Sequence, residues 1–342
     1  MRKRWIIAGI VVLALAAGYT GYWVWLARTF ERNLALWIDQ QRAMGYRISL
    51  SAGEPQGYPF PIRIRLTDVT VQAPGGRSPW RLETDSMRLG IAPWRPLTLT
   101  IDDGQAQPQY RLRLAAADRM YDLSIEGLSL DLDLPTNGAP LAVRIRKQSV
   151  GVSRNGSPIA DLGQFFGNVE VSQARSHDES SIRFELAADS IDFHLPPPTE
   201  TVETYFWQLS GKVMGQIPPE PLPSALASWS RDGGYLEVAQ LKADWEAVAR
   251  VNFEGSGALD PQLQPIASMT ARLYNYPDLI DWLATLGVLT SSQATATKFA
   301  LAAKSRPSAD GRMEAQVPFT IQDGYVSVGA MKIAQIPRIE WP

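Results

Sequence analysis

The feature that most constrains this fold is a two-residue alternation of apolar and polar side chains that begins after Gly45 and continues to Leu195. In the stretch 110–114 apolar residues alternate with arginines, and in the stretch 128–134 leucines alternate with serine and aspartate. Because successive side chains of a strand point to opposite faces, each such stretch predicts a strand with one apolar and one polar face. Parallel strands covered by helices would read as continuous apolar runs, so the sequence predicts an antiparallel sheet with one wet face.

Turn signals separate many of these strands. Asn-Gly and Asp-Gly pairs suit the positive φ of tight hairpin turns, and they occur at 103–104, 137–138, 155–156, 310–311 and 323–324. A proline-rich interval at 196–223 is a candidate internal boundary, because proline cannot donate to a strand ladder. Apolar stripes near 277–286 and 291–304 predict two short helices. The predicted fold class is mainly β (β-rich α+β): a curved antiparallel sheet or partly open trough with a few packed helices, preceded by one N-terminal transmembrane helix.

The N-terminus carries a candidate membrane anchor. A basic stub, residues 1–4, precedes the uncharged run 5–27. As a helix this run would extend about 34 Å, enough to cross a hydrocarbon core of about 30 Å. A cleaved signal peptide is the competing interpretation, because Ala14-Leu15-Ala16 resembles a small-residue cleavage site. Apolar character continues past that site into Tyr22-Trp23-Val24-Trp25-Leu26, and such aromatic residues suit the membrane interface. We expect an uncleaved single pass through the cytoplasmic (inner) membrane, with the stub in the cytoplasm and the rest in the periplasm.

After the anchor, residues 28–45 have the pattern of an amphipathic stalk helix, which Gly45 can end. The apolar positions near one stripe are Phe30, Leu34, Trp37, Ile38 and Met44. No helix breaker separates this stretch from the anchor, so one long helix can leave the membrane and dock on the folded body. A short linker helix packed on the core is the alternative. The β-rich body then comprises residues 46–342.

Composition excludes several classes of protein. The chain has 33 Lys+Arg against 35 Asp+Glu, a formal net charge of −2, whereas nucleic-acid-binding proteins usually carry a strong basic excess. Cysteine is absent, which excludes disulfides and thiolate metal sites. With only two histidines, a histidine-based metal cluster is not expected either. We therefore predict no nucleic-acid partner, no metal site and no cofactor.

Few side chains suggest catalysis. Asp131 and Asp133 share one strand face, as an Asp-x-Asp metal pair would, but we interpret them as the solvated face of an amphipathic strand. His177 lies in a polar stretch typical of a loop, and His194 fits a surface position on an edge strand. Gly255-Ser256-Gly257 lacks the outer glycines of a nucleophile elbow. The sequence predicts that the protein is not an enzyme.

Several segments carry a family resemblance. Three of them are Gly57-Tyr58-Pro59-Phe60, Ile91-Ala92-Pro93-Trp94-Arg95-Pro96 and Asp323-Gly324-Tyr325-Val326-Ser327-Val328-Gly329. They resemble a Gram-negative envelope family known as domain of unknown function 2125. The segment from Gly233-Gly234-Tyr235-Leu236 to Leu286-Gly287 is also similar to AsmA-like envelope proteins. The resemblance implies a periplasmic β-rich body on an inner-membrane anchor. The AsmA-like group is associated with membrane homeostasis and with lipid movement along apolar β-grooves.

The expected function follows from the apolar sheet face. Large apolar side chains left in water forfeit about 1.5–3 kcal/mol each, and the few predicted helices, chiefly those near 277–286 and 291–304, are not enough to cover such a face. We expect a groove for lipid or a hydrophobic envelope partner, lined by Leu112, Leu114, Leu130, Leu132, Val143 and Ile145. A structural scaffold whose own helices cover the face is the first alternative. A hydrolase that uses carboxylates such as Asp131 and Asp133 is the less favoured one.

Overall fold

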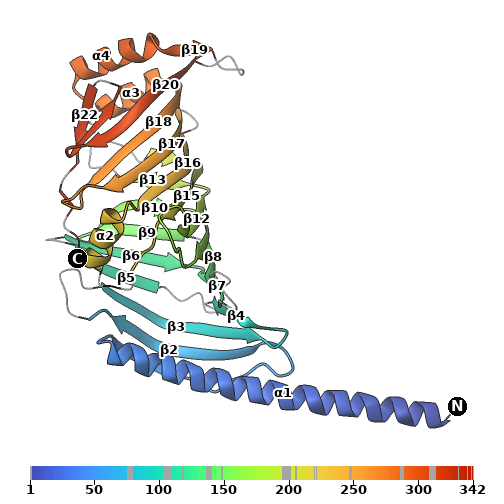
Figure 1. Cartoon of the computed structure of the whole chain (residues 1–342). Coiled ribbons are helices and arrows are strands. Elements are labelled where there is room, and N and C mark those ends of the chain that lie inside the picture. Colours follow the sequence, from blue (N-terminus) through green and yellow to red (C-terminus); the bar gives the residue numbers. More distant parts are fainter. Residues whose placement is uncertain are drawn as a thin grey trace. The chain divides into compact units, whose positions relative to one another are not determined.

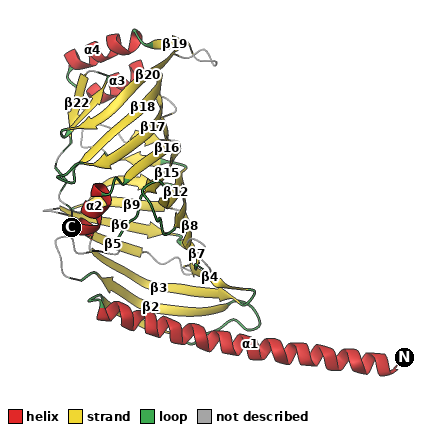
Figure 2. Cartoon of the chain, in the orientation of Figure 1, coloured by secondary structure: helices red, strands yellow, loops and turns green. Residues whose placement is uncertain are grey.

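The chain folds into two compact units, unit 1 (Met1–Leu134) and unit 2 (Pro135–Pro342). The structure is a computed structural model, and strands dominate both units (Figures 1 and 2). The described residues are 2–74, 80–102, 110–116, 119–135, 141–147, 149–194, 202–204, 206–218, 220, 222–245, 249–285, 289–307, 313–329, 331–336, 338–339 and 341.

Unit 1 consists of one long helix and a branched antiparallel sheet. Its elements are α1 (Arg2–Ala43), β1 (Arg47–Ala52), β2 (Ile62–Gln72), β3 (Trp80–Ala92), β4 (Arg95–Asp102), β5 (Tyr110–Ala116), β6 (Arg119–Glu126) and β7 (Ser129–Asp133). β2 pairs with β1 and β3. One half of β3 pairs with β4, which pairs with β7, and the other half pairs with β5, which pairs with β6. The sheet therefore divides at β3.

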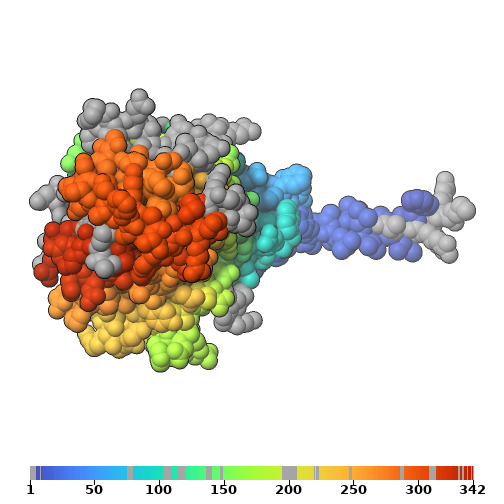
Figure 3. Space-filling view, turned by 90° about the horizontal axis from the view of Figure 1, so that it is seen from above, coloured from blue at the N-terminus to red at the C-terminus, as the bar shows by residue number. Residues whose placement is uncertain are grey.

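The helix α1 is continuous over 42 residues, so the predicted anchor and the predicted stalk form one helix. Its N-terminal part extends freely (Figures 1 and 3), and Trp5–Ala43 is long and apolar enough to cross a membrane. Its C-terminal part packs on the sheet of unit 1 and buries Phe30 and Ile38. The predicted apolar stripe is wrong at two positions. Trp37 is exposed because the last turns present Ile38 to the sheet instead, and Met44 is exposed beyond the end of the helix.

Unit 2 contains the remaining elements. They are β8 (Leu141–Lys147), β9 (Ser149–Arg154), β10 (Ser157–Leu162), β11 (Phe165–Val171), β12 (Ser180–Ala188), β13 (Ile191–Phe193), β14 (Val202–Thr204), β15 (Phe206–Met214), α2 (Leu222–Arg231), β16 (Tyr235–Trp245), β17 (Ala249–Leu259), β18 (Pro265–Tyr274), α3 (Tyr276–Thr285), α4 (Ser291–Ala302), β19 (Ser305–Pro307), β20 (Met313–Gln322), β21 (Tyr325–Val328) and β22 (Met331–Gln335).

Most strands of unit 2 form one large antiparallel sheet. Its order is β8–β11–β12–β15–β16–β17–β18–β20, after which β19 and β21 both pair with β20, and β22 pairs with β21. A smaller antiparallel set has the order β9–β10–β13–β14. The two are linked where β10 leads into β11 and β12 leads into β13. There the Gly163 amide donates to the Ser190 carbonyl at 2.9 Å, and the Asp189 amide donates to the Gln164 carbonyl at 3.1 Å.

The predicted fold class is confirmed: the chain is mainly β, its described strand pairs are antiparallel, and a long apolar helix precedes them. Two predicted hairpin turns have the positive φ angles that such turns need, at Asn155-Gly156 between β9 and β10 and at Asp323-Gly324 between β20 and β21. The other predicted turn pairs, at 103–104, 137–138 and 310–311, lie outside the described residues. The interval 196–223 lies within unit 2, because β15 begins in it and pairs on both edges, with β12 and β16.

Candidate functional site

The apolar face of unit 1 is covered at one end. Ile62, Ile91, Leu99 and Leu132 lie opposite one another in a row that crosses β2, β3, β4 and β7. α1 packs on the β2 end, where Ile62 is 0% exposed and Trp23 belongs to the same buried cluster. Leu99 and Leu132 are only half-buried. Coverage by the helix therefore decreases from β2 to β7.

The apolar face of unit 2 is wider. One row of opposite residues crosses the large sheet from β8 to β20 and consists of Ile145, Gly167, Leu186, Leu209, Leu241, Phe253, Ala271 and Val317. α3 and α4 pack on the β17, β18 and β20 end of this face. Ala271 and Val317 are buried there in one cluster with Leu279 of α3 and Leu301 of α4. This end has a dry core.

The other end of the same face is less well covered. Its apolar side chains on β8, β11, β12 and β15 are half-buried, and we call them the half-covered face: Val143, Ile145, Val169, Phe184, Leu186, Leu209 and Val213. Among the described helices, α3 and α4 contact the strands at the opposite end of the sheet. The same face of the sheet is thus dry near β20 and partly wet near β8.

Two glycines make the half-covered face shallow. A Cβ atom on Gly167 would lie 3.2 Å from Leu186 Cδ2 and 3.4 Å from Ile145 Cβ, so those side chains lean over the glycine. A Cβ atom on Gly211 would meet the Glu237 carbonyl oxygen of β16 and would lie 2.9 Å from Phe184 Cζ. Neighbouring side chains, and at Gly211 also the backbone of β16, therefore fill the space that the glycines leave. A shallow apolar surface suits an extended hydrocarbon chain or an apolar partner segment better than a compact polar ligand.

The predicted groove residues fall on both units. Leu112 on β5 lies opposite Leu82 and Leu123, and Leu130 on β7 lies opposite Ile101. Leu132 continues the row described above for unit 1. Val143 and Ile145 belong to the half-covered face of unit 2. The side chain of Leu114 lies outside the described residues. The others are all half-buried, and their common role as a groove stays a prediction.

The polar faces carry ion pairs between neighbouring strands. Arg88 and Asp102 pair between β3 and β4, with Arg88 Nε 2.7 Å from Asp102 Oδ1. Arg113 Nε lies 2.8 Å from Asp122 Oδ1 between β5 and β6. Hydrogen bonding to the Asp122 carboxylate, with its charge, raises the pKa of the Arg113 guanidinium. These contacts align the wet side of the sheet, as cross-strand charge pairs do.

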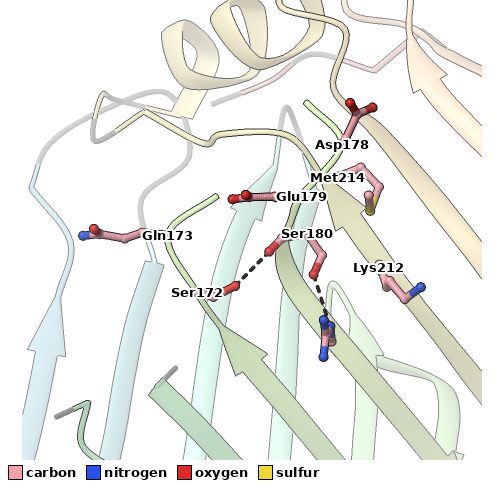
Figure 4. Close-up of a pocket in the computed structure, with 8 residues that line it drawn as sticks. Ser172, Gln173, Asp178, Glu179, Ser180, Lys212 and Met214 are labelled. Carbon is pink, nitrogen blue, oxygen red and sulfur yellow. Dashed lines mark hydrogen bonds between the residues drawn. The ribbon is translucent and has the colours of Figure 1, made fainter. Parts of the chain in front are cut away.

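Cavities among the described residues of unit 2 include three that no predicted groove residue lines. One of about 440 Å³ lies at the loop between β11 and β12 and at the end of β15 (Figure 4). Ser172 Oγ donates to the Ser180 carbonyl at 2.8 Å, and Arg183 Nε donates to Ser180 Oγ at 3.2 Å. In Figure 4 the Gln173 and Lys212 side chains point away from each other rather than converging. The other two cavities, of about 320 and 290 Å³, are lined by sheet residues around Ser268 and Ser210.

The side chains considered for catalysis lie apart or on the surface. Asp133 Oδ1 accepts a 2.7 Å hydrogen bond from Thr98 Oγ1 across β4 and β7, as a residue of a polar strand face does. His177 Nε2 lies 3.1 Å from Asp178 Oδ1 in an exposed loop, and His194 Nε2 lies 2.6 Å from Asp161 Oδ2. Within the described parts of the chain, no three histidine, cysteine, aspartate or glutamate side chains lie close enough together to hold a metal ion.

The sequence did not predict one set of contacts, between α1 and two loops of unit 1. Tyr19 and Trp23 of α1 donate to the Pro59 and Phe60 carbonyls, at 2.5 and 2.9 Å. Tyr22 of the same helix donates to the Pro93 carbonyl at 2.8 Å. The loop residues in these contacts belong to two of the motifs that carry the family resemblance, Gly57-Tyr58-Pro59-Phe60 and Ile91-Ala92-Pro93-Trp94-Arg95-Pro96. The aromatic and proline residues of these motifs indicate turns, but nothing in them indicates contact with a helix.

These features define a class of protein: a β-rich chain built from antiparallel sheets, with one helix long and apolar enough to cross a membrane. Residues 23–337 match the family described as "Uncharacterized protein conserved in bacteria (DUF2125)". The chain belongs to this family, as the resemblance in its turn motifs predicted. No curated protein and no solved structure matches the chain. The similarity to AsmA-like proteins stays a prediction.

Proposed function

We propose that this protein is a non-enzymatic, membrane-anchored component of the bacterial cell envelope that binds a lipid acyl chain on the half-covered face of unit 2. α1 anchors the chain in the cytoplasmic membrane, and the β-rich body lies in the periplasm. The location follows from the basic stub before the anchor and from the family resemblance. The role we infer is in envelope lipid homeostasis.

One observation carries the binding proposal: α3 and α4 cover the β17, β18 and β20 end of the apolar face, whereas the β8, β11, β12 and β15 end is only half-buried. Partly wet aliphatic side chains such as Leu186 and Leu209 lose part of the stabilisation that full burial supplies, about 25 cal/mol for each Å². An acyl chain laid on these residues would recover it. An anchored protein lies beside a bilayer, which is a reservoir of such chains.

The test uses photo-crosslinking at two consecutive residues that point to opposite faces of β12. Leu186 lies on the half-covered face, and its neighbour Glu185 lies opposite Ser210 and Asn168 on the polar face. The full chain carries a benzophenone amino acid at position 186 or 185 and is reconstituted into phosphatidylethanolamine and phosphatidylglycerol vesicles. After irradiation, mass spectrometry should detect a phospholipid adduct at position 186 and several-fold less at position 185.

Two outcomes would overturn the proposal. Equal lipid adducts at 185 and 186 would mean nonspecific contact with the vesicle. A protein adduct at 186 without any lipid would support the scaffold alternative, in which the face is covered by polypeptide. Retained β-sheet content in both variants, measured by circular dichroism, shows that the labelled chains are folded.

A further inference from the structure

Three large aromatic side chains near the point where α1 meets the sheet of unit 1 are exposed. Tyr58 and Phe60 lie in the loop between β1 and β2, and Trp94 lies in the turn between β3 and β4. Their side chains are 52%, 66% and 63% exposed. We call these three residues the aromatic tip. Exposed large apolar groups gathered at one place indicate a contact surface.

Direct contacts join the aromatic tip to α1. Thr20 Oγ1 lies 2.7 Å from the Tyr58 hydroxyl, and the Trp23 ring meets the Tyr58 ring edge-on with centroids 5.6 Å apart. The hydrogen bonds from Tyr19, Tyr22 and Trp23 to the loop carbonyls fix both loops against the same side of the helix. The tip is therefore held at the level of residues 19–23 of α1.

The length of α1 sets the depth of that level. From Trp5 to Tyr19 a helix rises about 21 Å, whereas a bilayer hydrocarbon core is about 30 Å thick. If Trp5 lies at the cytoplasmic boundary of the core, the opposite boundary lies about six residues beyond Tyr19 at 1.5 Å per residue, near Trp25. The loops attached at residues 19–23 then lie about 3–9 Å below that boundary. Tilting of the helix would place them deeper.

The chemistry of the loops suits this depth. Aromatic side chains concentrate at membrane interfaces, because their rings are apolar and their polar edges remain hydrated. Trp25 of α1 is also exposed and stacks on Tyr22 with centroids 6.1 Å apart. The Pro59, Phe60 and Pro93 carbonyls accept hydrogen bonds from α1 side chains, which satisfies backbone groups that lipid could not. Basic residues follow both tryptophans closely, Arg28 after Trp25 and Arg95 after Trp94.

The Gly57 backbone makes the first loop possible. Its φ of +117° lies in the region that favours glycine, and a Cβ atom there would lie 2.1 Å from the Pro61 carbonyl oxygen. The Phe60 amide donates to the Gly57 carbonyl at 2.6 Å, which closes the turn and turns the aromatic side chains outward. The loop is built to present these side chains.

We propose that the aromatic tip inserts into the interfacial region of the leaflet on the side of the body, beside α1, as a second membrane contact. This inference rests on α1 being a membrane anchor, which is part of the proposed function. A single helix can rotate about its own axis in a bilayer. The second contact fixes how unit 1 faces the membrane.

The experiment uses the absence of cysteine from the chain. Single variants Phe60→Cys and Trp94→Cys are labelled with an environment-sensitive fluorophore, and the full chain is reconstituted into phosphatidylcholine and phosphatidylglycerol vesicles. Nitroxide groups on the lipids, placed either near the headgroup or deep in the acyl chain, then quench the fluorophore according to its depth. Leu15→Cys in the apolar part of α1 is the deep reference, and Trp37→Cys is the reference outside the membrane; both residues are exposed.

We expect the shallow nitroxide to quench the Phe60 and Trp94 labels several-fold more than the Trp37 label, and the deep nitroxide to quench the Leu15 label. If Leu15 is quenched while Phe60 and Trp94 behave like Trp37, the aromatic tip proposal is wrong and the anchor stands. If Leu15 is not quenched, the anchor itself is wrong. If the tip labels respond to protein concentration rather than to the lipid nitroxides, the tip contacts a second copy of the chain, which also overturns the proposal.

Discussion

Single residues in one row of unit 1 differ in burial although their sequence surroundings are alike. Ile62, Ile91, Leu99 and Leu132 all sit in alternating stretches, and the alternation correctly places them on an apolar face. Only the fold distinguishes them: Ile62 is 0% exposed and Ile91 8%, whereas Leu99 and Leu132 are half-buried. The pattern predicts which face a residue occupies, and the packing of α1 decides how dry that residue is.

This difference predicts unequal losses on truncation. Ile62→Ala removes a fully buried side chain and should lower the free energy of unfolding by about 2–5 kcal/mol. Leu132→Ala should cost less than half as much, because part of that side chain is already in water. Urea unfolding of the full chain in the same detergent micelles measures both. Equal losses would show that Leu132 is fully covered, and would remove the gradient of coverage in unit 1.

The two-residue alternation of β2 is interrupted at Asp68. Leu66 and Val69 are three positions apart on β2, yet both are buried in the same cluster. Between them Asp68 has a φ of 53°, so the backbone turns locally and the alternation restarts in the opposite phase. The register with β3 is unchanged, since Thr67 lies opposite Ser86 and Val69 lies opposite Thr84. A strict two-residue period could not predict this position.

At the scale of elements, the sequence predicts correctly those helices whose formation depends on residues close together in the chain. The helices predicted near 277–286 and 291–304 are α3 (Tyr276–Thr285) and α4 (Ser291–Ala302). The residues of the stretch 201–209 fit strand and helix patterns alike, so the sequence alone predicts no element there. The described residues of this stretch belong to β14, which pairs with β13, and to β15, which pairs with β12 and β16. Pairing between segments distant in sequence decides such cases.

The start of α4 offers a test of one covering helix. Thr290 is its N-cap: the Thr290 side chain accepts from the Gln293 amide, and the Gln293 side chain accepts from the Thr290 amide at 2.8 Å. Thr290→Ala removes half of this capping box and should cost about 1 kcal/mol of stability. It should also speed hydrogen exchange of the first α4 amides.

Thr295→Ala is the matched control for this cap. Thr295 is an exposed threonine inside the same helix, and its hydroxyl only donates back to the Ser291 carbonyl at 3.0 Å. Because alanine has the higher helix propensity, this change should be neutral or slightly stabilising. Equal destabilisation by the two substitutions would contradict the role of the cap.

At the scale of the whole molecule, the sequence predicts the class of fold better than its site. Alternation and an uncharged N-terminal run predict antiparallel sheets and a candidate anchor, because each is a property of consecutive residues. Which part of an apolar face stays half-covered depends on where α1, α3 and α4 pack, and no local pattern contains that information. The contacts of Tyr58 and of the Pro93 carbonyl with α1 were missed for the same reason.

The placement of the whole chain in the cell depends on α1. If α1 is retained as an anchor with its basic stub in the cytoplasm, the exposed Met44 just beyond α1 lies outside the cytoplasmic membrane. In this cysteine-free chain, Met44→Cys should react with a membrane-impermeant maleimide once the outer membrane alone is permeabilised. Leu15→Cys, inside the apolar part of α1, should not react. The purified natural chain should have the full mass of 37.8 kDa. Labelling of Met44→Cys only after lysis would reverse the orientation, and a mass reduced by the first sixteen residues would show cleavage after Ala16.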